Sequence, residues 1–174
     1  MLREFDGITP VLEDGAWVDQ TALVLGDVVL GEDASVWPMT VLRGDVNYIR
    51  IGARTNIQDG TIVHVAHAGG MHPEGFPAIV GDDVTVGHNA VIHACTIGNR
   101  CLIGMSATVM DGAVIEDEVI VGAGAMVPPG KRLRAGHLYL GSPAREKRPL
   151  TDEEREFLTY SAAHYVELAR KHAR

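Results

Sequence analysis

The sequence predicts an all-β solenoid of hexapeptide repeats followed by a C-terminal α-helix, and three observations lead to this fold class. An aliphatic residue returns at almost every sixth position from Val18 to Val127, and a small or branched residue follows it four positions later. Glycine often stands directly after the aliphatic residue, as in Ile51-Gly52. Only 5% of the 174 residues are aromatic, so aliphatic side chains must fill the core in a regular way. A six-residue repeat of this kind is typical of a parallel β-helix.

Each hexad is expected to form a short strand and a corner. The aliphatic residue points inward and the small residue allows a tight turn, so three hexads complete one triangular coil. Coils stack at about 4.7–4.9 Å, the spacing of paired strands, and each coil therefore satisfies the backbone groups of its neighbours. The repeat leaves the handedness of the solenoid open. The inward positions are Val18, Val24, Leu30, Val36, Leu42, Ile51, Ile57, Val63, Val80, Val86, Ile92, Ile97, Ile103, Val109, Ile115, Val121 and Val127.

The register slips at three places. Three extra residues lie within 44–50, a longer insertion covers 66–77, and one residue is missing between Ile92 and Ile97. We expect the insertion at 66–77 to leave the solenoid as a loop.

The hexads end at Pro143, and the composition then changes to that of a helix. Thr151 and Glu154 have the spacing of a capping box, and a helical pattern extends to about Lys171. One apolar stripe is expected to pack along the solenoid, formed by Phe157, Leu158, Ser161, Tyr165 and Leu168. We therefore assign residues 1–143 to the β-helix and residues 144–174 to a helix that packs on it, within a single domain.

Composition excludes several partners. The net charge of −8 lacks the basic excess that nucleic acid would attract, and no apolar run approaches the length that crosses a bilayer. Cys95 and Cys101 form neither a CxxC pair nor a larger framework, and the first residues lack the blocks of a signal peptide. We expect a cytoplasmic protein with no nucleic-acid or membrane partner, in which both cysteines fill the core.

The repeat places the histidines. His64 and His93 each follow an inward residue, Val63 and Ile92, and lie one coil apart on the same face. Arg43 occupies the same position in the preceding coil, which predicts a column of three side chains.

His88 lies on a different face and is expected to stack on Asp59. Two imidazoles one strand spacing apart can bind one metal, and three histidines with an open position form a catalytic zinc site. His88 is too far along the extended chain to join that metal within one subunit. A symmetric trimer, in which His88 of one subunit faces His64 and His93 of another, resolves this difficulty.

Other polar residues surround this position. Arg43 and Asp45 are predicted to form an ion pair at a subunit interface, and Gln58 is placed to hydrogen-bond a metal-bound water. His67 and His72, in the inserted loop, are either proton carriers or solvated residues. The remaining histidines, His137, His164 and His172, are expected to be surface residues or core residues whose hydrogen bonds are satisfied.

The chain resembles the γ-class carbonic anhydrases, in their bacterial hexapeptide-repeat subgroup. The resemblance covers nearly the whole chain and depends on motifs that match in order. These are Leu42-Arg43-Gly44-Asp45, Asn56-Ile57-Gln58-Asp59-Gly60, Thr61-Ile62-Val63-His64, Val86-Gly87-His88, Ile92-His93-Ala94-Cys95, Tyr139-Leu140-Gly141-Ser142-Pro143-Ala144 and Tyr160-Ser161-Ala162.

The resemblance implies a left-handed β-helix and a homotrimer that converts CO2 and bicarbonate reversibly. It implies a metal held by His64, His88 and His93 across each interface, with Zn2+ expected and Fe2+ or Co2+ as alternatives. Arg43 and Asp45 would pair between subunits. Gln58 and Asp59 would stand beside the metal-bound hydroxide, and Tyr160 would approach the site from the helix.

The chain departs from the family pattern at the proton carrier. The best-characterised family enzymes carry a glutamate after the residue that matches Asp45, and a second glutamate in an acidic loop. Here Val46 stands at the first position, and Glu74 is the only glutamate of the loop. Two alternatives to a carbonic anhydrase therefore stay open: an acyl-CoA thioesterase or acyltransferase on the same scaffold, and a non-enzymatic metal-binding or assembly protein.

Overall fold

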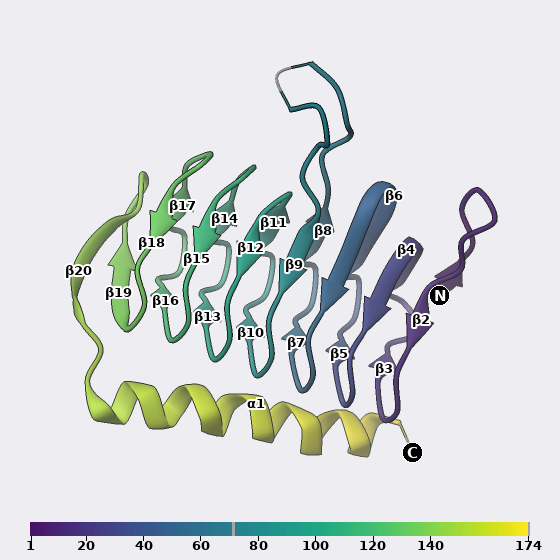
Figure 1. The fold of residues 1–174 in the computed structure, drawn as a ribbon. Helices are drawn as coiled ribbons and strands as arrows, with labels where there is room; N and C mark the ends of the chain where they lie inside the picture. Colours follow the sequence, from purple (N-terminus) through teal and green to yellow (C-terminus); the bar gives the residue numbers. More distant parts are fainter. Residues whose placement is uncertain (71, 174) are drawn as a thin grey trace.

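A computed structural model describes residues 1–70 and 72–173, and it shows a parallel β-solenoid with one helix along its length (Figure 1). The predicted solenoid and its C-terminal helix are confirmed. Arg174, the last residue of the segment assigned to the helix, lies outside the described residues.

The solenoid has three faces. The first, here called the helix face, consists of β3 (Trp17–Val18), β5 (Ser35–Val36), β7 (Asn56–Ile57), β10 (Thr85–Val86), β13 (Leu102–Ile103), β16 (Ile120–Val121), β19 (His137–Leu140) and β20 (Arg145–Pro149). The second, here called the histidine face, contains β1 (Leu2–Arg3), β8 (Ile62–His64), β11 (Val91–His93), β14 (Thr108–Val109) and β17 (Met126–Val127). The third contains β2 (Val11–Leu12), β9 (Ala78–Val80), β12 (Thr96–Ile97), β15 (Val114–Ile115) and β18 (Arg132–Leu133). Two long strands, β4 (Leu23–Leu30) and β6 (Val41–Ile51), turn a corner and belong to both the second and third faces.

The inward positions form the core, as the repeat predicts. Every one of them from Val24 to Val127 is at most 3% exposed, and the small corner residues such as Ala90 and Ala107 are equally buried. Cys95 and Cys101 are free and buried, and burial raises the pKa of both thiols to about 12. Both cysteines therefore act as core residues and not as nucleophiles.

All three register slips have a structural counterpart. The extra residues at 44–50 lengthen β6, and the missing residue falls at the corner between β11 and β12. The insertion at 66–77 leaves the solenoid between β8 and β9 as a projecting hairpin, with bridges Ala66–Phe76 and Gly69–His72 (Figure 1).

After Pro143 the chain first forms β20, which pairs antiparallel with β19 and covers the end of the helix face. The sequence pattern did not indicate this strand. Helix α1 (Asp152–His172) follows and packs against β5, β7 and β10, and its N-terminus has the predicted capping box between Thr151 and Glu154. No helix among the described residues is long and apolar enough to cross a membrane.

The buried stripe of α1 differs in part from the predicted one. Leu158 and Ser161 are buried as expected, but Phe157 is 50% exposed. Small residues, Ala162 and Ala169, take part in the buried stripe instead. Their size lets the helix backbone approach the flat sheet, so Phe157 lies at the edge of the contact.

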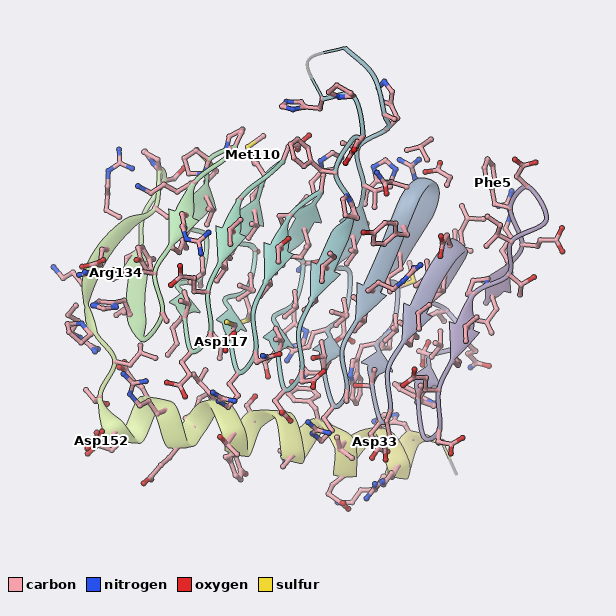
Figure 2. All side chains as sticks on the ribbon, viewed as in Figure 1. Phe5, Asp33, Met110, Asp117, Arg134 and Asp152 are labelled. Atoms are coloured by element: carbon pink, nitrogen blue, oxygen red, sulfur yellow. The ribbon has the colours of Figure 1, made fainter. Side chains whose placement is uncertain are left out.

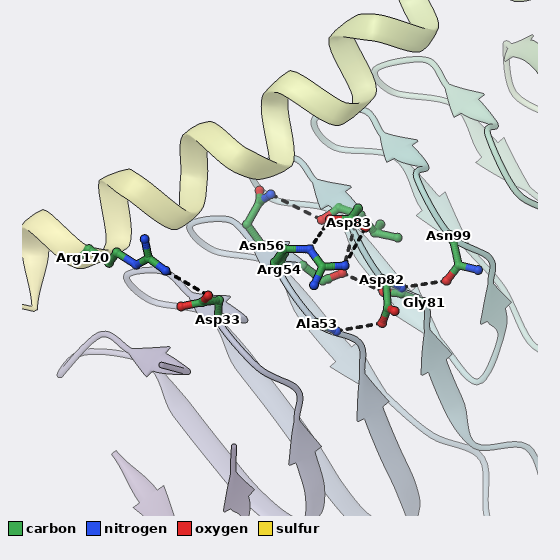
Figure 3. Close-up of polar contacts among 11 residues, drawn as sticks. Asp33, Ala53, Arg54, Asn56, Gly81, Asp82, Asp83, Asn99 and Arg170 are labelled. Atoms are coloured by element: carbon green, nitrogen blue, oxygen red, sulfur yellow. Dashed lines mark hydrogen bonds and ion pairs between the residues drawn. The ribbon is translucent and has the colours of Figure 1, made fainter. Parts of the chain in front are cut away.

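The charges at the two ends of the solenoid match the direction of α1. Residues 1–33 contain eight Asp or Glu and one Arg, whereas residues 131–148 contain six Lys or Arg and one Glu. The acidic first turn of α1 lies at the basic end, and its basic last turn lies at the acidic end, as Asp152 and Asp33 show in Figure 2. One ion pair lies at each end of α1: Arg148–Glu154 (2.7 Å) at its N-terminus and Arg170–Asp33 (3.1 Å) near its C-terminus. The second pair is drawn in Figure 3.

Replacing Glu154 with glutamine is expected to lower the free energy of unfolding by about 1 kcal/mol at pH 7, because it removes the negative charge that pairs with Arg148 in the first turn of α1. Hydrogen bonds from Arg148 and from the backbone of Thr151 lower the pKa of Glu154 from 4.5 to about 2. A carboxylate with a lowered pKa stabilises the fold fully above its unfolded pKa, and this contribution is lost as the pH falls toward 2. Urea unfolding should therefore show a difference from wild type at pH 7 that shrinks below pH 4.5. Glu156→Gln, on the same helix, is the control, and a difference that does not depend on pH would contradict the assignment.

Candidate metal centre

His64 and His93 lie side by side on the histidine face. They are register partners on β8 and β11, and Arg43 on β6 is the register partner of His64. The predicted column of Arg43, His64 and His93 is therefore present. The regular stacking of coils produces it, since each residue directly follows an inward aliphatic side chain.

The two imidazoles face each other through one nitrogen and face a carboxylate through the other. His64 Nδ1 and His93 Nε2 are 3.2 Å apart. His64 Nε2 lies 3.1 Å from Asp45 Oδ1, and His93 Nδ1 lies 2.6 Å from Asp111 Oδ1. A neutral imidazole carries one N–H, and an ionised carboxylate can only accept. When both rings are neutral, each donates to its carboxylate, and two nitrogen lone pairs are left facing each other.

This arrangement fits a cation. Two lone pairs at 3.2 Å repel unless a positive charge lies between them. Imidazole ligands at about 2.0–2.1 Å in a tetrahedral site have their nitrogens roughly 3.3 Å apart, close to the separation found here. Carboxylates on the outer ring nitrogens are also the usual partners of metal-binding histidines. The residues present thus fit two ligands of one metal.

Burial and charge favour the protonation states that a metal needs. Burial is the main reason that the pKa of His64 lies below its usual value; the hydrogen bond to Asp45 opposes this shift, and the positive charge of Arg43 adds to it. Burial opposes ionisation of Asp45, but hydrogen bonds from Arg43 and His64 outweigh it and hold the pKa of Asp45 below its usual range. A neutral histidine beside an ionised aspartate is the pair that metal binding requires.

His88 lies apart from this pair, at the corner that follows β10. Its Nδ1 is 2.8 Å from Asp59 Oδ2, which confirms the predicted stacking of His88 on Asp59. The hydrogen bond leaves the Nε2 lone pair free on a side chain that is 42% exposed. Within residues 1–70 and 72–173 no group of three His, Cys, Asp or Glu side chains gathers as a metal site. His88 of the same chain therefore does not complete the coordination of His64 and His93.

A cavity of about 360 Å³ opens beside His88, between α1 and the helix face. Gln58 and Tyr165 line its polar side, and Leu102, Met105 and Phe157 are among the residues that line the rest. Burial raises the pKa of the Tyr165 phenol, and the nearby Gln58 side chain opposes this shift. Gln58 is thus next to His88, as its predicted role requires.

Tyr160 has a different position from Tyr165. It is 62% exposed, its ring stacks on His164, and it contacts the rim residue Phe157 without lining the cavity itself. The family resemblance implies that Tyr160 approaches the site, whereas Tyr165 is the tyrosine of α1 that lies beside Gln58 in the same chain. Tyr165 belongs to the predicted apolar stripe of the helix, whereas Tyr160 lies outside it.

The remaining predicted residues lie as follows. Arg43 Nη1 is 2.5 Å from Asp45 Oδ2 in the same chain, and their pairing across an interface stays a prediction. His67 and His72 are exposed on the projecting hairpin. Asp111, the partner of His93, was not predicted. It stands two positions after an inward residue, whereas His93 stands one position after an inward residue, so the repeat does not stack one on the other.

Three comparisons place the chain among known proteins. The family model for the bacterial transferase hexapeptide (six repeats) matches residues 94–129. The chain is 50% identical to Protein YrdA of Escherichia coli, over 95% of the chain and 90% of that protein. It is 46% identical to γ carbonic anhydrase 1, mitochondrial, of Arabidopsis thaliana, over 99% of the chain but 62% of that longer protein.

A solved structure shows the same fold. The crystal structure of a hexapeptide transferase family protein from Anaplasma phagocytophilum is 40% identical and has a TM-score of 0.90, with 98% of this chain and 96% of that chain covered. The predicted left-handed parallel β-helix is thereby confirmed.

Proposed function

Because the chain belongs to the hexapeptide-repeat family that includes the γ-class carbonic anhydrases, we propose that it is a metal-dependent carbonic anhydrase that converts CO2 and bicarbonate reversibly. The facing lone pairs of His64 and His93, 3.2 Å apart, carry the proposal, since they need a cation between them. Zn2+ is the expected ion, and Fe2+ or Co2+ are alternatives because imidazole binds all three.

The third ligand would come from another copy of the chain. His88 has a free, half-exposed Nε2 and lies on a different face from His64 and His93. A cyclic homotrimer brings His88 of one copy to the histidine face of the next and repeats the site at each interface. Arg43 and Asp45, on that face beside His64, would then lie at the contact.

The bound metal would lower the pKa of water to about 7 and so supply a nucleophile for CO2 at neutral pH. The chain's own residues orient the ligands and the substrate. Asp45, Asp59 and Asp111 each accept a hydrogen bond from a ligand histidine and fix the nitrogen that faces the metal. Gln58 lies on the cavity floor beside His88. Tyr160, exposed on α1, would act only on the site of another copy.

The apolar cavity favours a second candidate function. A space of about 360 Å³ lined by Leu102, Met105 and Phe157 suits an acyl chain better than CO2. An acyl-CoA thioesterase, or an acyltransferase as the name of the matching family model suggests, is therefore the alternative activity. The cytoplasmic location stays a prediction from sequence.

Stopped-flow CO2 hydration tests the proposal. The protein is loaded with Zn2+ and, in the absence of oxygen, with Fe2+, and His93→Ala serves as the blank. Turnover above the blank is expected with at least one of the two metals. Fully loaded protein without turnover would overturn the proposal. Hydrolysis of acyl-CoA by that protein would then support the second candidate, and a stable trimer inactive on both substrates would indicate an assembly role.

Replacing Asp111 with asparagine is expected to weaken metal binding about 10- to 100-fold, because His93 loses the carboxylate that orients it. Affinity is measured by competition with a chromophoric chelator. Asp82→Asn is the matched control, since Asp82 accepts a hydrogen bond from the Ala53 amide at another corner and asparagine can accept it equally (Figure 3). Equal affinities of the two variants would show that Asp111 does not support His93 as a ligand.

A further inference from the structure

A chain of buried polar side chains connects α1 to Gln58 beneath the helix. The Ser161 and Thr85 hydroxyl oxygens are 2.8 Å apart. Asn56 Nδ2 donates to Thr85 Oγ1 at 3.0 Å, and Gln58 Nε2 donates to Asn56 Oδ1 at 3.0 Å. All four side chains belong to residues that are at most 6% exposed. The helix therefore contacts the candidate site through hydrogen bonds as well as through packing.

The chain has a defined polarity. Asn56 Nδ2 also donates to the Val84 carbonyl at 3.3 Å, and a carbonyl can only accept, so the nitrogen of Asn56 must face that side. The side-chain oxygen of Asn56 then faces Gln58, so Gln58 must donate to it through Nε2. The Gln58 carbonyl oxygen is left on the side of the cavity, next to His88.

These polar residues occupy positions at which the following coils carry leucine or glycine. Leu102, the register partner of Thr85 in the next coil, takes the same position under α1. Gly87 and Gly104 follow the inward residues of the next two coils, where Gln58 follows Ile57. Buried polar groups lower stability unless every one is paired, so a hydrogen-bonded run from Ser161 to Gln58 that ends beside His88 indicates a role at that site.

We propose that Ser161 and Thr85 are positioning residues, which hold Asn56 and, through it, the Gln58 carboxamide with its carbonyl oxygen toward the cavity. The site beside His88 thereby presents a hydrogen-bond acceptor and favours a ligand that donates a hydrogen bond at this point. The effect on catalysis rests on the proposed function, whereas the orientation of Gln58 is a property of the folded chain and is measured separately.

Hydrogen exchange of the Gln58 side-chain NH2 group tests the positioning. In 15N-labelled protein its pair of NMR signals is identified by its loss in Gln58→Glu. The double variant Thr85→Val/Ser161→Ala is expected to speed this exchange at least about tenfold. Ser35→Ala is the matched control, because Ser35 is also buried on β5 under α1 but its hydroxyl accepts from Trp37 Nε1 at 3.0 Å. Thr85→Ser keeps the hydroxyl and should exchange as wild type does.

The possible outcomes are distinct. Unchanged exchange in the double variant, or equal acceleration in Ser35→Ala, would overturn the positioning role. If the double variant does not fold, Ser161→Ala alone is measured against the same criterion. In metal-loaded protein, kcat for CO2 should fall about tenfold at unchanged metal content and recover in Thr85→Ser. Wild-type protein with no turnover but with the expected exchange pattern would reject the proposed function and leave the positioning role intact.

Discussion

Replacing His93 with alanine is expected to abolish stoichiometric metal binding and to lower CO2 hydration at least about 100-fold. His93 supplies one of the two facing nitrogens, and its removal leaves the His64 Nδ1 lone pair without its counterpart at 3.2 Å. Asp111 then loses the ring that it orients, so both the ligand and its support disappear. A loss this large separates a ligand from a residue that only surrounds the site.

Metal content per chain, measured by mass spectrometry after dialysis, gives the result independently of turnover. His137→Ala is the matched control, because His137 is an imidazole on β19 whose Nδ1 contacts only the backbone carbonyl of Ala135. That variant should keep full metal content and full rate. Full metal content in His93→Ala would show that the metal lies elsewhere in the protein, and the trimer-interface site would be wrong.

The pair of histidines was predictable because the solenoid converts sequence spacing into spatial position. Once Val63 and Ile92 are recognised as inward residues one coil apart, the residues that follow them must stack. The same hexad spacing predicts that His88 stacks on Asp59, and their hydrogen bond confirms it. Backbone pairing between coils allows no other register, since a slip by one residue would turn the aliphatic side chains outward.

The parts that were not predicted depend on contacts outside the repeat. Asp111 reaches His93 from a corner, where the shortened coil after Ile92 shifts the count by one position. The apolar stripe predicts that Tyr165 faces the solenoid, but it does not determine which coil the residue meets, so its position beside Gln58 was not predicted. Strand β20 pairs antiparallel with β19 at the end of the helix face, and hexad spacing does not predict this contact.

Replacing Ile103 with alanine is expected to lower the free energy of unfolding by about 2–5 kcal/mol. Ile103 is fully buried, and its neighbours in the column are Val86 and Val121. The coils cannot close the resulting cavity, because backbone hydrogen bonds on all three faces hold them at their spacing. The midpoint of thermal unfolding should fall by roughly 10 °C.

Ile79→Ala is the matched control for this substitution. Ile79 is the residue before the inward Val80 on β9, and its side chain is half-buried on the outside of the solenoid. Removing the same atoms there should cost much less, because no cavity forms inside the coils. Thermal unfolding followed by circular dichroism compares the two variants at equal protein concentration. Equal losses would mean that the inward column does not carry the stability of the fold, and the stacking that places His64 beside His93 would then need another cause.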